Sequence, residues 1–157
     1  MFLILQKDDL TPVTRQYIVQ APEVAQKAQP GQFVIVRLEE PGERIPLTIA
    51  DFDRQAGTLT LVVQEVGAST RQMGTMGAGD SLLDLVGPLG RPSEIERFGT
   101  VICAGGGVGI APIYPIARGL RQAGNTVISV IGARSQNLLF WEEKMRAVSD
   151  ELIVCTD

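Results

Sequence analysis

Residues 102–112 read ICAGGGVGIAP, and four glycines stand within five positions of this stretch. An apolar run precedes the glycines, and a helical pattern follows them. Glycine loses more conformational freedom on folding than any other residue, so such a cluster marks a left-handed turn or a close approach of the backbone to another group. The stretch therefore predicts a strand, a tight loop and a helix in immediate succession.

The apolar runs around the glycine loop predict parallel strands. TVICAGG (100–106) and NTVISVIGA (125–133) are nearly continuous apolar runs, which is typical of parallel strands that helices cover on both faces. ELIVCT (151–156) predicts a third buried strand. The order strand, helix, strand, helix, strand corresponds to half of a doubly wound parallel α/β sheet. Because the sequence stops at Asp157, we expect a nucleotide-binding domain that is only partly present.

Two helices are predicted between these strands. The first has Pro112 and Pro115 in its first turn, where missing backbone donors matter little, and Gly124 as its end. The second begins after Ser135, a candidate N-cap. The apolar positions at helical spacing are Ile113, Ile116, Ala117 and Leu120 in the first helix and Leu138, Trp141, Met145 and Val148 in the second.

Short β-like runs separated by turn residues fill the first half of the chain. They are rich in Val, Ile, Leu and Thr, which favours an antiparallel sandwich or a small barrel. The predicted strands are residues 2–6, 13–22, 33–38, 47–52, 58–66 and 81–88. We therefore expect two domains, residues 1–92 and residues 93–157.

Composition excludes several classes of function. The formal net charge is -4 and the basic residues form no cluster, so no nucleic-acid partner is expected. No apolar run approaches the roughly 18 residues of a membrane span, and the N-terminus lacks a signal peptide, so we expect a cytoplasmic protein. Histidine is absent, which excludes Ser/His/Asp catalysis and histidine-ligated metals. Cys103 and Cys155 lie in apolar runs, which predicts buried thiols rather than a disulfide.

The glycine loop is a candidate pyrophosphate site, because backbone N–H groups at a helix start carry positive partial charge. The dinucleotide pattern GxGxxG is only partly matched, since Ile110 stands where the third glycine would follow Gly105 and Gly107. A tight strand-to-helix turn without a ligand is the alternative. The acidic residue that usually follows the second strand is replaced by Gly-Ala-Arg at 132–134, which leaves NAD and NADP both open.

With these residues in view, GGGVGIAP (105–112) resembles the GGTGIAP loop of the ferredoxin-NADP reductase superfamily, and the resemblance extends over nearly the whole chain. PGQF (30–33) is similar to the turn that leads into the flavin-binding barrel of that superfamily. RIPLT (44–48) resembles its RxYS/T flavin motif in the RxPxS/T form, and GAST (67–70) resembles its GxxS/T phosphate loop. GDSLLDLVGPLGRP (79–92) is similar to its closing strand and interdomain turn.

The resemblance implies an N-terminal antiparallel FAD-binding β-barrel, 1–92, followed by a partial doubly wound parallel α/β domain for NAD(P), 93–157. It implies that Arg44 meets the FAD pyrophosphate, that Leu47 lies against the flavin ring and that the Thr48 hydroxyl reaches flavin N5, which makes Thr48 the catalytic candidate. The other FAD candidates are Ile45, Pro46, Val62, Val63, Gln64, Gly67, Ser69 and Thr70. The candidates for NAD(H), with NADP open, are Gly106, Gly107, Val108, Gly109, Ile110, Gly132, Ala133 and Arg134.

Within this superfamily the sequence most resembles FAD- and NAD-binding electron-transfer subunits, such as those serving sulfide dehydrogenase, NADH-dependent ferredoxin:NADP oxidoreductase and, more distantly, dihydroorotate dehydrogenase. It implies a flavoprotein oxidoreductase subunit that moves a hydride between NAD(P)H and FAD and passes electrons to an iron-sulfur partner. Longer members carry a [2Fe-2S] centre in a C-terminal part that this sequence lacks. The expected partner is a catalytic subunit or a ferredoxin-type electron carrier.

Other interpretations of the same residues stand beside this one. Val108 replaces the threonine of the family loop, which removes one hydroxyl from the nicotinamide side. Taken singly, Arg44 is also compatible with a surface charge, GAST with a helix cap and PGQF with a β-turn. The alternative function is a non-catalytic nucleotide-binding or interaction domain of the same fold, and a third is a self-sufficient small flavin reductase.

Overall fold

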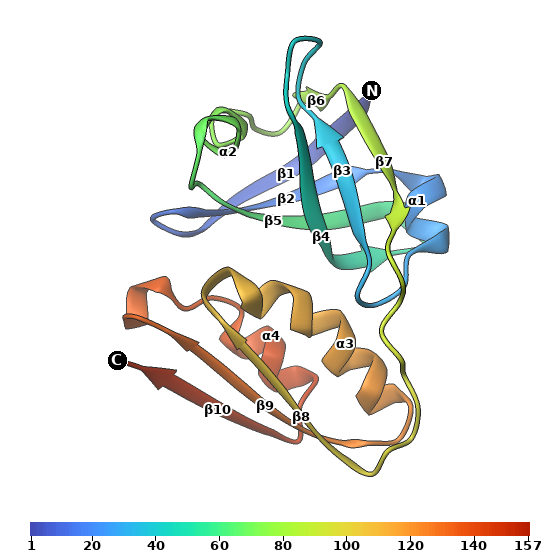
Figure 1. Ribbon diagram of the computed structural model, residues 1–157, viewed down its shortest axis with the longest axis vertical. Helices are drawn as coiled ribbons and strands as arrows, with labels where there is room; N and C mark the ends of the chain where they lie inside the picture. Colours follow the sequence, from blue (N-terminus) through green and yellow to red (C-terminus); the bar gives the residue numbers. More distant parts are fainter.

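The computed structural model describes residues 1–157, and Figure 1 shows a β-barrel above a smaller parallel sheet with helices. The barrel is a seven-stranded sheet of order β6-β1-β2-β5-β4-β3-β7 with antiparallel pairing throughout. The two edge strands, β6 and β7, pair with β1 and β3 respectively and follow one another directly in the chain, so the sheet nearly closes. Its strands are β1 (Phe2–Thr11), β2 (Thr14–Gln20), β3 (Phe33–Arg37), β4 (Arg44–Asp53), β5 (Thr58–Gln64), β6 (Ser81–Leu82) and β7 (Asp84–Leu89). The predicted antiparallel barrel is confirmed.

Alternation of side chains along the strands produces the barrel core. In β3, Val34 and Val36 are buried, while the alternate residues Phe33, Ile35 and Arg37 are half-buried. Tyr17, Leu59 and Leu61 are fully buried in the same cluster. Burial of this apolar interior is the main force that holds the barrel together.

Two short helices complete the barrel, and the first differs from the prediction. The run 13–22 was expected to be one strand, but β2 ends at Gln20 and α1 (Pro22–Lys27) follows. Pro22 stands at the helix start, where its fixed φ suits a first turn, and Val24 and Ala25 are buried. The second helix, α2 (Ala68–Met73), starts in the GAST stretch.

The second half contains three parallel strands in the order β10-β9-β8. They are β8 (Thr100–Gly106), β9 (Thr126–Ala133) and β10 (Glu151–Thr156), close to the predicted bounds. Between them lie η1 (Gly107–Gly109), α3 (Ile110–Gln122), η2 (Gln136–Leu138) and α4 (Glu142–Ala147). The predicted partial α/β domain is confirmed.

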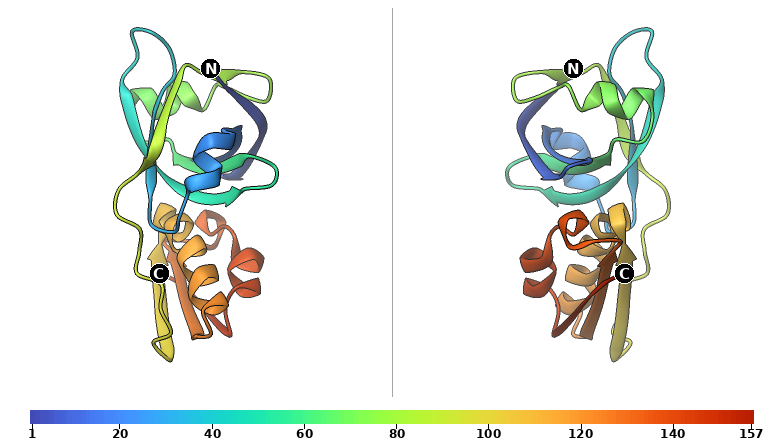
Figure 2. Two further views of the ribbon diagram at one scale, coloured as in Figure 1. Left: turned by 90° about the vertical axis from the view of Figure 1, so that its right-hand side faces the viewer. Right: turned by 90° about the vertical axis from the view of Figure 1, so that its left-hand side faces the viewer.

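The prediction that helices cover both faces of this sheet is wrong. Figure 2 shows α3 and α4 on the same side of the strands. On the open face, Ile102 is 70% exposed and Ile153 is 41% exposed. β10 was expected to be buried, but none of its residues is, because it is an edge strand with one covered face. Cys155 is accordingly exposed, contrary to expectation, whereas Cys103 is buried as predicted.

Helix α3 has more buried surface than the predicted stripe. Ile110 and Ala117 are fully buried and Tyr114 nearly so, while Ile113 and Ile116 are half-buried. The difference arises because α3 lies between the barrel and the sheet and packs on both (Figure 1). Because η1 runs directly into α3, Pro115 falls inside the helix rather than in its first turn as predicted.

The second predicted helix is interrupted. Ser135 precedes only the short turn η2, and α4 starts after Trp141, whose φ of 60° lies in the left-handed region. The Trp141 indole donates a hydrogen bond from Nε1 to Gln16 Oε1 at 2.8 Å and packs edge-on against Tyr114. These contacts accompany a left-handed backbone that divides the predicted helix into two elements.

Residues 90–99 link β7 to β8 without regular structure. Asn125 fixes the end of this linker, since its Oδ1 accepts hydrogen bonds from the amides of Phe98 and Gly99 at 2.6 and 2.9 Å. The expected domain boundary between residues 92 and 93 falls in the linker and stays a prediction. None of the helices is long and apolar enough to span a membrane.

Candidate nucleotide-binding cleft

A cleft of about 290 Å³ lies between the barrel and the start of α3. One wall comes from β4, β5 and the region of α2, and the other comes from η1 and the first turn of α3. The lining residues are Ile45, Pro46, Leu47, Thr48, Val62, Val63, Gln64, Val66, Thr70, Val108, Gly109, Ala111 and Pro112. The predicted flavin motif and the predicted glycine loop thus face one another across a single cleft.

The cleft has the character of a small-molecule site. Ile45, Leu47 and Val63 supply nearly buried apolar side chains, while Thr48 and Gln64 place polar groups among them. Sites for organic cofactors are mostly apolar concavities with a few well-placed polar groups. The wall formed by β4 and β5 therefore suits a flat, largely apolar ring system.

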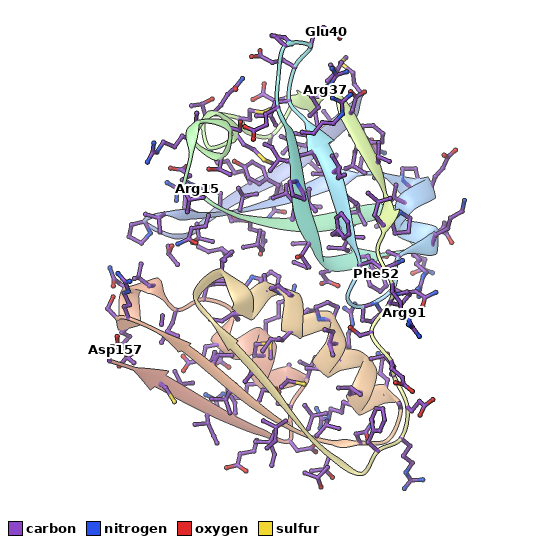
Figure 3. All side chains as sticks on the ribbon, viewed as in Figure 1. Arg15, Arg37, Glu40, Phe52, Arg91 and Asp157 are labelled. Atoms are coloured by element: carbon purple, nitrogen blue, oxygen red, sulfur yellow. The ribbon has the colours of Figure 1, made fainter.

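A second pocket of about 570 Å³ adjoins this cleft, because Gln64 and Val108 line both. The other lining residues are Val13, Thr14, Gly106, Gly107, Gly132, Ala133, Arg134, Leu138, Cys155, Thr156 and Asp157. Gly106 is in register with Gly132, and Gly132 with Cys155, so the pocket lies at the carboxyl ends of the three parallel strands. This is where open α/β sheets bind ligands. Asp157 is labelled at the edge of the molecule in Figure 3.

Four predicted site residues do not line either pocket. Arg44 is exposed at the start of β4, and Gly67 and Ser69 lie beside the cleft without forming its wall. Ile110 is fully buried in the core of the α3 half, and its amide is bonded to the carbonyls of η1. Ile110 therefore holds the glycine loop through its backbone, and its buried side chain is not accessible to a ligand.

The GAST stretch forms a helix cap in this structure. Thr70 Oγ1 accepts hydrogen bonds from the amides of Val66 and Gly67, both at 2.9 Å. The Ser69 hydroxyl donates to Glu43 Oε2 at 2.5 Å. The hydroxyls expected to hold a phosphate are thus engaged with the protein itself, and the acidic Glu43 stands beside Arg44.

The four glycines of the loop divide into two pairs. A Cβ on Gly105 would lie 2.6 Å from the carbonyl oxygen of Gly109, so the fold requires glycine at this position, and the left-handed φ of +56° at Gly107 favours glycine there. A Cβ on Gly109 would have nothing within 4 Å, and one on Gly106 would approach only Gly132, at 3.8 Å. Since the fold does not need glycine at these two positions, their bare backbone fits the close approach of a dinucleotide phosphate.

Sequence reasoning missed several lining residues. Thr14 is paired in register with Gln64, a predicted residue, so the strand pairing would have found it. Ala111 and Pro112 belong to the same GGGVGIAP stretch as the predicted glycines. No sequence motif marks Thr156 and Asp157 as lining residues, because their position in the pocket depends on the register of β10 against β9.

The buried thiol near the loop is chemically quiet. Burial raises the pKa of Cys103, so this thiol stays protonated at neutral pH. Its side chain lines neither pocket. Cys103 is therefore not a candidate reactive group of either pocket.

An antiparallel barrel and a parallel sheet with a glycine loop, meeting at a shared cleft, form the arrangement of ferredoxin reductase-like proteins. Phthalate dioxygenase reductase superposes with a TM-score of 0.80 at 18% identity, covering 99% of this chain and 51% of that one, which is a likeness of fold alone. The NADH-dependent reduced ferredoxin-NADP oxidoreductase, solved in connection with flavin-based electron bifurcation, superposes with a TM-score of 0.94 at 44% identity, covering 98% and 56%.

Sequence comparison gives related proteins. The chain is 45% identical over 154 residues to a homolog of the electron transfer subunit of dihydroorotate dehydrogenase B (NAD(+)) from Thermotoga maritima, covering 98% of this chain and 55% of that protein. It is 27% identical over 161 residues to the same-named subunit of Bacillus cereus, covering 99% and 62%. No protein-family model matches. The resemblance to the ferredoxin-NADP reductase superfamily is confirmed, and the chain spans little more than half the length of these relatives.

Proposed function

We propose that this chain is the FAD- and NAD(P)H-binding part of an electron-transfer flavoprotein subunit. The observation that carries the proposal is the shared cleft, in which residues 45–48 of the flavin motif lie opposite Val108, Gly109, Ala111 and Pro112. Relatives that match nearly the whole chain include electron transfer subunits and an NADH-dependent oxidoreductase. When bound, FAD and NAD(P)H would supply the redox chemistry, in which two electrons and one proton pass from nicotinamide C4 to flavin N5.

The barrel side would bind and orient the flavin. Leu47 and Pro46 would lie against the ring, and the Thr48 hydroxyl would approach N5, the atom that accepts the hydride. Arg44 is exposed near this wall, and its guanidinium offers a planar set of donors that suits a pyrophosphate. Leu47, Val62 and the neighbouring apolar side chains would keep water away from the ring.

The sheet side would bind the nicotinamide dinucleotide. The bare backbone at Gly106 and Gly109 would face its phosphates, and residues 132–134 would lie along the adenosine end. Arg134 is exposed in this pocket, which suits a 2'-phosphate, whereas Asp157 in the same pocket suits a ribose hydroxyl. These two residues alone leave both dinucleotides open. Because the names of two relatives include NAD(+) and NADH, we propose NAD(H) and test NADPH beside it.

We also propose a route by which electrons leave the flavin. Electrons would leave the flavin singly toward an iron-sulfur centre, held by a catalytic partner subunit or a ferredoxin-type carrier. The name of the solved relative that matches at 44% identity includes a ferredoxin, which supports a carrier of this kind. We also propose a cytoplasmic location.

One observation favours the alternative, a non-catalytic nucleotide-binding domain of the same fold. Thr70 is occupied in the cap of α2, and Ser69 is occupied by Glu43. A domain of that kind would bind one nucleotide and leave flavin unbound or permanently oxidised.

An absorbance spectrum of the purified chain, with FAD supplied and then NADH or NADPH added, separates the two functions. We expect flavin bands that bleach with the dinucleotide. Arg44→Ala is expected to weaken FAD binding by about tenfold or more, since a charged hydrogen bond contributes roughly 1.5–3 kcal/mol. Arg97→Ala, an exposed arginine in the linker, is the matched control and should bind FAD as the wild type does. A chain that takes up no flavin would refute the proposal.

A further inference from the structure

A cluster of charges joins the barrel to α3 and α4 outside the cleft. Asp51 of β4 accepts a hydrogen bond from Arg118 Nη1 at 2.7 Å through Oδ1 and another from Lys144 Nζ at 3.1 Å through Oδ2. The Asp51, Arg118 and Lys144 side chains are 19%, 25% and 32% exposed, so solvent screens them only in part. We call these three residues the junction cluster.

Aromatic rings hold both cations of the junction cluster in place. The Arg118 guanidinium lies 5.2 Å from the ring centroid of Phe52, on the barrel, and 5.2 Å from that of Tyr114. Lys144 Nζ lies 4.5 Å from the Trp141 ring centroid, and the Trp141 indole is bonded to Gln16 of β2. Figure 3 labels Phe52 at the junction of the two halves. Sliding of one half over the other would break ion pairs and cation–π contacts together.

Two of the three elements that carry the junction cluster, β4 and α3, also form walls of the cleft. On β4, Asp51 stands three residues beyond Thr48, about 10 Å along the strand. On α3, Arg118 stands seven residues beyond Ala111, which lines the cleft, about 10 Å along the helix. The strand and the helix are therefore tied together at one end and face each other across the cleft at the other. Ala50 and Ala117 pack in one apolar cluster between them.

We propose that Asp51 is a positioning residue: by holding Arg118 and Lys144 it fixes α3 against β4 and so sets the separation of the flavin and nicotinamide sites. This rests on the proposed function. In that reaction the nicotinamide C4–H bond breaks, a bond to flavin N5 forms, NAD(P)H is oxidised and FAD is reduced. The junction cluster touches none of these atoms and acts only through distance. Reacting atoms need to lie about 3–3.5 Å apart, and a displacement of about 1 Å lowers the rate by roughly a hundredfold.

The geometric arm of the test measures the separation of the two halves without any ligand. Spin labels are placed on the full chain at Glu23→Cys in α1 and Glu143→Cys in α4, two exposed helical positions, with the exposed native thiol removed by Cys155→Ser. We expect a narrow distance distribution that becomes wider with Asp51→Asn. Asp53→Asn, an exposed carboxylate on the same strand, is the matched control and should leave the distribution unchanged.

The kinetic arm measures flavin reduction by NADH in a single turnover, together with the dissociation constant of FAD. With Asp51→Asn we expect the reduction rate to fall about tenfold or more while FAD affinity stays within about twofold, because the flavin wall itself is intact. Arg118→Met keeps an unbranched apolar stem but removes the guanidinium that pairs with Asp51 and lies over Phe52, and it serves as a second variant should Asp51→Asn fail to fold. Combining the two substitutions should slow reduction no further than Asp51→Asn alone, because Asp51→Asn already breaks the ion pair that Arg118→Met removes.

The outcomes separate this proposal from the proposed function. If the wild type binds no FAD or is not reduced, the proposed function fails, and the spin-label arm alone decides whether the junction cluster sets the separation. An unchanged distance distribution in Asp51→Asn overturns the positioning role. A wider distribution with an undiminished reduction rate overturns it as well.

Discussion

Adding one methyl group to the glycine loop should lower the free energy of unfolding at Gly105 but not at Gly109, where it should weaken NADH binding instead. Gly105→Ala would place a Cβ 2.6 Å from the carbonyl oxygen of Gly109, 3.0 Å from its carbonyl carbon and 3.1 Å from Ile113 Cδ1. The first two are backbone atoms of the turn that starts α3, so the clash cannot be relieved by a side-chain rotation. We expect a loss of about 1–3 kcal/mol in the free energy of unfolding, the usual range for overpacking. For a chain of this size that is roughly 3–9 °C in Tm.

Gly109→Ala carries the same methyl group into open space. Gly109 has a φ of -65° and a ψ of -9°, which alanine adopts readily, and the new Cβ would meet nothing within 4 Å. We expect unfolding stability to be unchanged or to rise by about 0.4–1 kcal/mol, because alanine restricts the unfolded chain. Binding of NADH should nevertheless weaken by about tenfold or more if the bare backbone at Gly109 is where the dinucleotide phosphates approach.

Urea unfolding followed by circular dichroism gives the two stabilities, and calorimetric titration with NADH gives the two affinities. A Gly105→Ala variant as stable as the wild type would show that this close approach is not a constraint of the fold. A Gly109→Ala variant with wild-type NADH affinity would remove the reason for assigning the loop to a ligand.

Three further results are expected. Asn125→Ala removes four hydrogen bonds, to the amides of Phe98 and Gly99 and the carbonyls of Glu96 and Leu120, and should lower unfolding stability by about 2 kcal/mol in urea titrations, with Asn125→Asp in between. Ile102→Ala should change stability by less than about 0.5 kcal/mol because Ile102 is 70% exposed, whereas Ile131→Ala, at a fully buried position of the same sheet, should cost about 3 kcal/mol; equal losses would refute the open face. Burial, with Glu65 adding to it, raises the pKa of Tyr17 from 10.0 to about 12, so the unfolded chain loses this proton first and stability should fall by about 2 kcal/mol between pH 10 and 12. In Tyr17→Phe the decline over that range should be smaller by this amount, as judged from urea midpoints at each pH.

The sequence predicted correctly those elements whose signals lie next to one another in the chain. β8 has the predicted bounds, since the apolar run and the glycines that end it are adjacent in the chain. The break at Trp141 was not predicted, because the residue that its indole contacts, Gln16, lies 125 positions away in the barrel. Likewise the open face of the sheet left no mark on the sequence, since Ile102 is as apolar as a residue that a helix covers.

The candidate site shows the same division. Residues 45–48 and 106–109 were identified from their own motifs, and the structure brings them to adjoining pockets. Ile110 was included because it belongs to the motif, but the helical turn directs it into the core. Asp51 and Arg118, 67 positions apart, were unremarkable charges in the sequence, and only the packing of α3 on β4 makes them partners.

Trp141 is the only tryptophan of the chain, and its indole bridges the two halves through Gln16 of the barrel and Lys144 of α4. The tryptophan fluorescence of this protein therefore comes from a single position, between the barrel and the helices of the parallel sheet. Tryptophan fluorescence excited near 295 nm therefore reports, without an attached dye, whether the barrel and the sheet are packed together. A flavin bound nearby would quench this fluorescence by energy transfer.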